Sequence, residues 1–347
     1  MGPNLWRKIA LITALSFGVP LIGADLPSMA PRPRIDYAMA YVPFRHAVAM
    51  HGGWYSPRWI PISEVWEWNG RGWSPWETSG APAFAHHSMV FDSMRNLLVV
   101  CGRETPNRGS YQMWEYDGSK WSQRADIPIG ASAQGDIKIA YDTARNRIVL
   151  YAARTKGTTE TWEYDGKSWQ QIKSAHQPVR CDDGALLQYD EAQHKTVLVG
   201  EDRTGNNLLS WDGHEWSADG GTGTQTWLWD GSDWTQVEGQ QPPKATWGGM
   251  AFDGLHQQVV LLTTRMETWV LKREWRQLHP STSPTPAPNG FFAMAYDPVR
   301  KVTVFFGGES RQGGLEKNWV YPDTTWMYDG ESWSTKLGAM DHSRSKP

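Results

Sequence analysis

The chain has 347 residues, of which 39% are hydrophobic, 20% are charged and 22 are tryptophan. This aromatic content is too high for a disordered chain, and the residues that dominate long coiled coils are not enriched. The formal charge of −3, with acids and bases interspersed, leaves no clustered basic face of the kind that binds nucleic acid. The composition, which includes 34 glycines, favours an all-β protein without a nucleic-acid partner.

The N-terminal segment 1–24 is predicted to be a signal peptide. Arg7 and Lys8 precede an apolar stretch, residues 9–22, and the small residues Gly23-Ala24 offer a cleavage point. The apolar stretch is shorter than the about 20 residues that span a bilayer comfortably. We therefore expect a secreted, periplasmic or cell-envelope protein with no stable membrane span after cleavage, and an uncleaved N-terminal anchor is the alternative.

One sequence unit recurs along the chain with the pattern W-x-(W/Y)-(D/N)-G-x-x-W. An Asp-Gly or Asn-Gly pair between alternating aromatic residues indicates a β-hairpin. Together the copies hold 16 of the 22 tryptophans, so the tryptophan excess is mainly a property of the repeat. Five copies are clear, at 66–73, 114–121, 162–169, 227–234 and 326–333, and two are degenerate, at 208–216 and 268–275.

The hairpin turn predicts a pairing of tryptophans. If Asp117-Gly118 is a two-residue turn, Tyr116 pairs with Ser119 and Trp114 lies opposite Trp121. A longer turn would change this register and keep the hairpin. The same arithmetic predicts the pairs Trp66–Trp73, Trp162–Trp169, Trp227–Trp234 and Trp326–Trp333.

A strand–turn–strand unit precedes each hairpin. Its first strand ends in an aromatic-Asp pair, and a β-branched run follows a polar turn. An arginine stands three residues after the aspartate in three units, where it predicts a short exposed ion pair that contributes about 0–1 kcal/mol. The units lie at 39–53, 89–103, 139–153, 187–201, 250–264 and 294–308, and the three pairs are Asp92/Arg95, Asp142/Arg145 and Asp297/Arg300.

Each strand–turn–strand unit and the hairpin after it together make four strands. Six such repeats, spaced about 50 residues apart, predict a ring of blades. The YD-x-x-R turn, the double glycines Gly52-Gly53 and Gly307-Gly308 and the WDG hairpin resemble the kelch-repeat β-propeller, in the bacterial form similar to the central domain of galactose oxidase. The resemblance covers residues 35–336 and implies an all-β propeller of six four-stranded blades. Residues 25–34 are expected to be a linker and 337–347 a disordered tail.

The number of blades has an alternative. Six strand–turn–strand units favour six blades, whereas seven hairpin signals favour seven. The hairpin at 208–216 is then either an insertion or a degraded seventh blade. We predict six.

The resemblance also implies where a binding face lies. It places the links between second and third strands, and those between blades, on the face opposite the YD-x-x-R and WDG turns. Loop candidates on that face are Trp54, Tyr55, Trp59, Arg103, Arg108, Tyr111, Trp319 and Tyr321, and the residues expected to ring the channel mouth are His87, Asp136, Asp183, Trp247 and Phe291.

Aromatic and arginine side chains dominate binding hot spots, and aromatic faces suit sugar rings. We therefore predict a module that binds a glycan or a protein partner. The alternatives are a galactose-oxidase-like or other propeller enzyme with a channel-mouth site, and a structural module of the cell envelope.

No catalytic residue, metal site or cofactor is predicted. The copper site implied by the oxidase resemblance needs two tyrosines, two histidines and a cysteine linked to a tyrosine, and neither Cys101 nor Cys181 has that context. Blade three separates the two cysteines, so we expect free thiols. His86-His87, the only adjacent histidine pair, is expected to be an ordinary loop segment.

Overall fold

The computed structural model describes most of the chain between residues 30 and 335. The described ranges are 30–54, 60–104, 109–124, 126–129, 133–154, 158–178, 181, 184–201, 209–211, 216–218, 223–243, 245–285, 290–312 and 318–335. The predicted signal peptide and C-terminal tail lie outside them. No helix in these ranges is long and apolar enough to cross a membrane.

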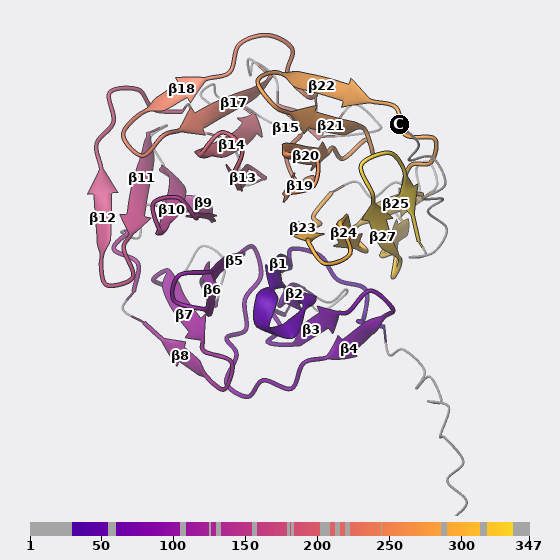
Figure 1. Cartoon of the computed structure of the whole chain (residues 1–347), viewed down its shortest axis with the longest axis horizontal. Helices are drawn as coiled ribbons and strands as arrows, with labels where there is room; N and C mark the ends of the chain where they lie inside the picture. The colour runs from indigo at the N-terminus through magenta and orange to yellow at the C-terminus, as the bar shows by residue number, and fades with distance from the viewer. Residues whose placement is uncertain are drawn as a thin grey trace, which may run out of the picture.

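Six four-stranded antiparallel sheets stand around a central axis as the blades of a propeller (Figure 1). Blade 1 consists of β1 (Ala38–Val42), β2 (Ala47–His51), β3 (Val65–Trp68) and β4 (Trp73–Pro75), with the 3-10 turn η1 (Pro43–Arg45) between its first two strands. Blade 2 consists of β5 (Ser88–Asp92), β6 (Leu97–Gly102), β7 (Gln112–Tyr116) and β8 (Trp121–Gln123). Blade 3 consists of β9 (Ala133–Asp142), β10 (Arg147–Arg154), β11 (Thr159–Tyr164) and β12 (Trp169–Ile172).

The second half of the ring repeats this plan. Blade 4 consists of β13 (Leu186–Asp190), β14 (Lys195–Glu201), β17 (Thr224–Trp229) and β18 (Trp234–Gln236). Blade 5 consists of β19 (Gly249–Asp253), β20 (Gln258–Leu262), β21 (Thr268–Leu271) and β22 (Trp275–Leu278). Blade 6 consists of β23 (Met294–Asp297), β24 (Val302–Phe306), β27 (Thr325–Tyr328) and β28 (Trp333–Ser334). The prediction of an all-β propeller with six blades is confirmed.

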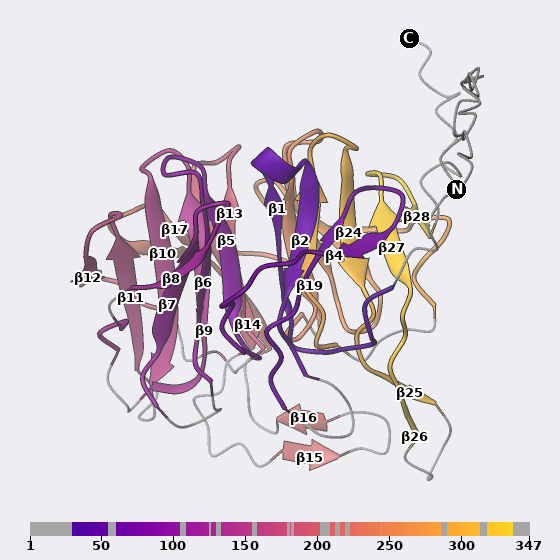
Figure 2. The same cartoon turned by 90° about the horizontal axis from the view of Figure 1, so that it is seen from below.

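Two short hairpins lie outside the blades. One joins β15 (Leu209–Trp211) to β16 (Trp216–Ala218), and the other joins β25 (Ser310–Gln312) to β26 (Asn318–Val320). Both project from the same face of the ring (Figure 2). The hairpin signal at 208–216 is therefore an insertion between the second and third strands of blade 4, not a seventh blade.

The predicted register of the WDG hairpins is wrong by two residues. Trp121 lies opposite Tyr116, and Trp114 lies opposite Gln123. The Asp117 carboxylate causes the change, because its Oδ1 accepts the backbone N–H groups two and three residues on, at 2.8 and 2.9 Å, and so closes a longer loop. The paired aromatics in the other blades are Trp68–Trp73, Tyr164–Trp169, Trp229–Trp234 and Tyr328–Trp333.

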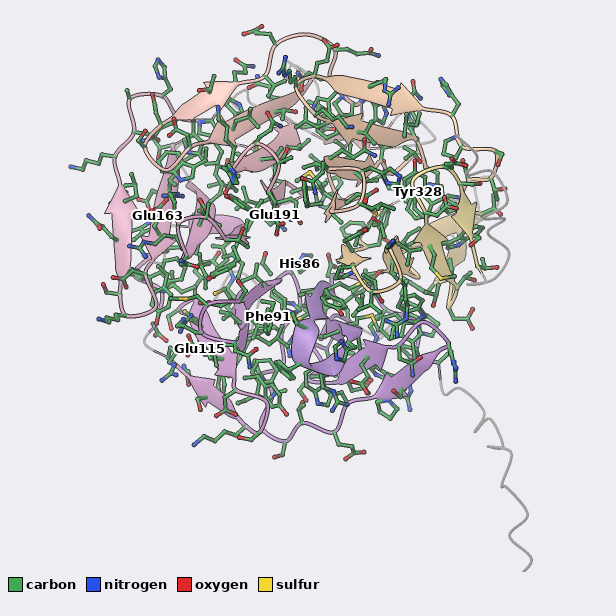
Figure 3. The ribbon with its side chains drawn as sticks, viewed as in Figure 1. His86, Phe91, Glu115, Glu163, Glu191 and Tyr328 are labelled. Carbon is green, nitrogen blue, oxygen red and sulfur yellow. The ribbon has the colours of Figure 1, made fainter. Side chains whose placement is uncertain are left out.

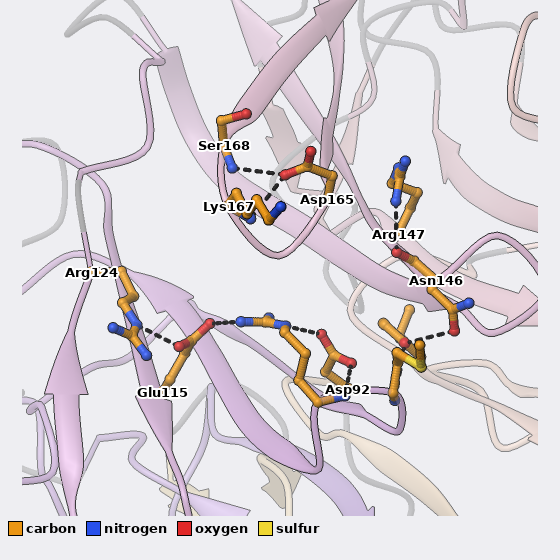
Figure 4. Close-up of polar contacts among 11 residues, drawn as sticks. Asp92, Glu115, Arg124, Asn146, Arg147, Asp165, Lys167 and Ser168 are labelled. Atoms are coloured by element: carbon orange, nitrogen blue, oxygen red, sulfur yellow. Dashed lines mark hydrogen bonds and ion pairs between the residues drawn. The ribbon is translucent and has the colours of Figure 1, made fainter.

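The turn ion pairs form, but they are not the exposed pairs that the sequence predicts. Asp92 is buried and accepts from Arg95 Nε at 2.7 Å. Arg95 also pairs with Glu115 on the third strand, which in turn pairs with Arg124 (Figure 4). The aspartates must be paired because they lie beneath the turn, where an isolated carboxylate is strongly disfavoured.

The ring closes through side chains and not through a borrowed strand. Each described blade takes its four strands from one continuous unit. At the seam between blades 6 and 1, Trp73 Nε1 donates to Thr325 Oγ1 at 2.7 Å, and Arg300 lies 5.6 Å from the ring of Trp68. Apolar side chains of the two blades share one buried cluster there. The two cysteines are buried and form no disulfide with each other, as predicted.

Candidate functional site

The first strands of all six blades surround a central channel. Residues of these strands, or just before and after them, line a cavity of about 440 Å³. Among the described strands each first strand pairs on one side only, with the second strand of its own blade. One end of the channel carries η1 and the equivalent turns, and the other end lies on the face from which the two extra hairpins project (Figure 2).

A chain of backbone hydrogen bonds follows the rim at this second end. The N–H of His86 donates to Asp36 O at 3.2 Å, Asp36 to Phe291 O at 3.1 Å, Phe291 to Trp247 O at 2.7 Å and Trp247 to Gly184 O at 2.9 Å. These residues stand at equivalent positions before the first strands of five blades. The rim is therefore a continuous backbone structure that ties blades 2, 1, 6, 5 and 4 together.

Four of these residues adopt a conformation that their side chains disfavour. The φ angles of Asp36, His86, Trp247 and Phe291 lie between 51° and 62°. Left-handed backbone is rare for bulky residues and is retained where surrounding structure holds it, often at ligand sites. Here the rim hydrogen bonds hold it.

Aromatic side chains gather at this rim. The Trp247 and Phe291 rings stack with centroids 5.5 Å apart and planes at 28°. Trp54 meets the His86 ring edge-on at 5.8 Å. Phe291 and Tyr321 both pack against the small buried cluster that contains Trp54. We call Trp54, His86, Trp247, Phe291 and Tyr321 the aromatic mouth.

Two carboxyl groups adjoin the aromatic mouth. Asp36 Oδ1 lies 3.2 Å from His86 Nδ1, which is beside the central opening (Figure 3). Glu309 is buried and accepts a hydrogen bond from the Tyr321 hydroxyl at 3.3 Å. Burial raises the pKa of Glu309, because the charged form loses its hydration. A carboxyl group beside a hydroxyl offers both donors and acceptors to a ligand at the aromatic faces.

Of the predicted site residues, the structure brings Trp54, Trp247 and Tyr321 together at the aromatic mouth. They come from the second-to-third-strand links of blades 1 and 6 and from the link between blades 4 and 5. Phe291, predicted for the channel mouth, lies among them. Loops far apart in the sequence thus meet at one place on the rim.

Other predicted residues lie elsewhere. Arg103 packs over the Tyr111 ring at 4.6 Å, and Tyr111 is buried, so these two form a pair of their own in blade 2. His87 is among the residues that line the central cavity, but it is buried, and its Nε2 lies 2.8 Å from His51 Nδ1. Its neighbour His86 occupies the rim position instead.

Some candidates cannot be placed. Tyr55, Trp59, Arg108 and Asp183 lie outside the described residues. Trp319 belongs to β26 and Asp136 to β9, but their side chains are outside the described part of the structure.

Sequence reasoning missed Asp36, Glu309 and the rim position of His86. A signal for the rim was present: Trp247, Phe291 and His86 each stand six residues before the aspartate of their turn, and Asp36 stands six before Val42, which replaces it. His87 is one residue off this count, which turns its side chain to the other side. Glu309 had no signal in the repeat, because it meets Tyr321 at the base of the inserted β25–β26 hairpin, where Ser310 pairs with Val320.

Among the residues that the structure describes, no group of three or more His, Cys, Asp or Glu side chains could hold a metal ion. The described part of the aromatic mouth therefore offers aromatic faces, hydroxyl and carboxyl groups as its means of binding.

Comparison with known proteins shows the fold alone. No family model matches the chain, and no curated protein matches its sequence. A mutant of the Aleuria aurantia lectin in complex with Fucα1-6GlcNAc is similar in structure, with 13% identity and a TM-score of 0.55, over 91% of this chain and 100% of that one.

Two further solved structures are similar. The SapL1 lectin in complex with α-methyl fucoside has 11% identity and a TM-score of 0.54, over 88% of this chain and 95% of that one. A protein of unknown function from Bacteroides thetaiotaomicron has 13% identity and a TM-score of 0.52, over 82% of this chain and 69% of that one. The likeness supports the six-bladed β-propeller and leaves the kelch type unconfirmed.

Proposed function

We propose that this protein is a binding module that holds a glycan at the aromatic mouth. The observation that carries the proposal is the stacked pair of Trp247 and Phe291 on the channel rim, next to Trp54 and two carboxyl groups. Aromatic faces cover the apolar face of a sugar ring, while carboxyl and hydroxyl groups bond its hydroxyls. Similar propellers that carry fucosides in their solved structures add support.

The rim favours binding because it is formed before a ligand arrives. Its backbone hydrogen bonds hold Trp247 and Phe291 in a conformation that a free loop would rarely keep. A preorganised site loses less conformational entropy on binding, so more of the contact energy remains as affinity. A protein ligand that presents a polar loop is the competing partner, and the experiment below separates the two.

We also propose that the propeller is of the kelch type and that the protein is exported. The YD-x-x-R turns and WDG hairpins support the first part, and the apolar segment 9–22 supports the second. Sequencing the N-terminus of the protein purified from its host tests export, since cleavage after Ala24 is expected and an intact Met1 contradicts it.

A glycan array tests the main proposal. The protein is expected to bind at least one glycan, and Trp247→Ala is expected to weaken that binding by about tenfold or more, as for an aromatic hot spot. Trp114→Ala is the matched control, because Trp114 is half-buried on the outer hairpin of blade 2. Equal binding by wild type and Trp247→Ala, or no glycan bound at all, would contradict the proposal.

A further inference from the structure

A pair of buried histidines lies behind the aromatic mouth. His51 is the last residue of β2, and His87 directly precedes β5. His51 is 0% exposed and His87 6%. His51 Nδ1 lies 2.8 Å from His87 Nε2, and His51 Nε2 lies 3.1 Å from the carbonyl oxygen of Pro82.

These contacts determine where the protons are. A carbonyl oxygen only accepts, so His51 Nε2 carries a hydrogen and donates it to Pro82. His51 Nδ1 is then the acceptor, and His87 Nε2 donates to it. His87 Nδ1 is buried without a hydrogen-bond partner among the described residues. This arrangement is the one in which both rings are neutral and each has one hydrogen, on Nε2.

The surroundings oppose a further proton on either ring. Arg34 acts on His51, and His86 and Lys138 act on His87; each disfavours added positive charge. No carboxylate of the described residues pairs with His51 or His87. Burial lowers the pKa of His51 to about 4 and that of His87 well below its ordinary value.

Protonation would also break the geometry. A proton on His51 Nδ1 would set two N–H groups against each other across the 2.8 Å contact, or would move the proton of His87 to its Nδ1, where no acceptor of the described residues lies. A proton on His87 Nδ1 would leave a buried cation without an acceptor. In both cases the pair can satisfy its hydrogen bonds only by moving.

The pair is connected to the rim through the segment 82–87. Pro82 accepts from His51, Phe84 O accepts from the N–H of Gly53 at 2.9 Å, and His86 donates to Asp36 O. The same segment carries the His86 ring to Trp54. Displacement of the histidine pair would therefore displace one side of the aromatic mouth.

We propose that the His51–His87 pair is an acid-sensitive lock on the aromatic mouth. While both rings are neutral the pair holds the segment 82–87 in place, and protonation of either ring releases it. The expected consequence is that ligand is bound near neutral pH and released in acid, and this consequence alone rests on the proposed function.

Hydrogen exchange read by mass spectrometry tests the lock without a ligand. In the wild type, peptides covering 82–87 are expected to exchange about tenfold faster at pH 4.5 than at pH 7, after correction for the intrinsic rate. His51→Gln is expected to reduce this change, because its amide can donate to Pro82 and accept from His87 but does not titrate, which leaves His87 as the one titrating ring of the pair. His194→Gln, on an exposed turn at the other end of the channel, is the control and should behave as wild type.

The outcomes separate the two proposals. No acid-dependent opening in the wild type, or the same opening in His51→Gln, would overturn the lock, and the wild-type comparison alone suffices if the variant does not fold. Glycan binding measured on the array at both pH values should fall in acid for the wild type and fall less for His51→Gln. If the segment 82–87 opens in acid but no glycan binds at either pH, the lock is retained and the glycan proposal is rejected. If a glycan binds equally at both pH values, release of the ligand in acid is rejected.

Discussion

The tryptophans of the last strands bind neighbouring blades together through single hydrogen bonds. In four blades this indole N–H donates to a threonine on the third strand of the preceding blade, as when Trp234 Nε1 donates to Thr161 Oγ1 at 2.8 Å. The equivalent threonine is replaced by Val65 and Met113 in blades 1 and 2. Accordingly, Trp121 Nε1 and Trp169 Nε1 are buried without a partner. The repeat tryptophans thus act mainly in the fold.

At this scale we predict that Thr161→Val lowers the free energy of unfolding by about 1–3 kcal/mol, because it leaves the buried indole N–H of Trp234 unpaired with little change in volume. Val65→Thr is the converse change and should raise it by about 1 kcal/mol, because it supplies an acceptor for Trp121. Urea unfolding of both variants measures the effects. If the free energy of unfolding falls equally in the two variants, the hydrogen bond is ruled out as the cause.

At the scale of the element, the turn of one blade rests on the hairpin of the next. Arg145 pairs with Asp142 at 2.6 Å and with Glu163 at 2.7 Å within blade 3. Its guanidinium also covers Gly231 in the hairpin of blade 4, where a Cβ would lie 2.5 Å from Nη1. Figure 4 shows the same neighbourhood between blades 2 and 3. The WDG glycine is therefore needed both for its positive φ and for the space that the arginine fills.

We predict that Gly231→Ala destabilises the protein by at least about 1 kcal/mol more than Gly239→Ala. Both glycines have φ near 90–101°, so both variants carry the backbone strain of about 1–2 kcal/mol. Gly239 has nothing within 4 Å of an added Cβ, whereas the methyl group at 231 displaces Arg145 from buried carboxylates. Thermal and urea unfolding measure the difference in stability between the two variants. Equal losses of stability would show that backbone strain is the only cause.

At the scale of the whole molecule, the closing seam resembles the other seams. The contacts between blades 6 and 1 are again an indole-to-threonine hydrogen bond and an arginine over an aromatic ring of the next hairpin. The arginine of blade 2 covers Tyr164 of blade 3 in the same way. Because each blade is complete in itself, the ring needs no strand exchange to close.

The stability of the whole molecule should decrease in acid through His51. Its folded pKa of about 4 is below the ordinary 6.5, so the unfolded chain takes up the proton first as the pH falls. The contribution of the neutral His51 to the free energy of unfolding is complete above pH 6.5 and is lost as the pH falls from 6.5 to about 4. This contribution amounts to about 3 kcal/mol. Urea unfolding at pH 7 and 4.5 should show a smaller loss for His51→Gln than for wild type; equal losses would place the acid sensitivity elsewhere.

The sequence by itself determined the strands and the positions of the turns, and it favoured six blades over seven. Alternation of aromatic residues, the Asp-Gly turns and the aromatic-Asp strand ends are local signals, and each acts within a few residues. Where a local signal had two solutions, such as the length of the turn at Asp117, the carboxylate decided through hydrogen bonds that no pattern of residue types specifies.

Only the tertiary structure decided the site. Trp54, Trp247 and Tyr321 are separated by nearly the whole chain and meet because the ring brings blade 1 beside blade 6. Which of His86 and His87 reaches the rim depends on a single residue of register, and Glu309 meets Tyr321 only because the inserted hairpin pairs Ser310 with Val320. Such contacts arise from closure of the ring, which adds long-range packing to units that are each locally determined.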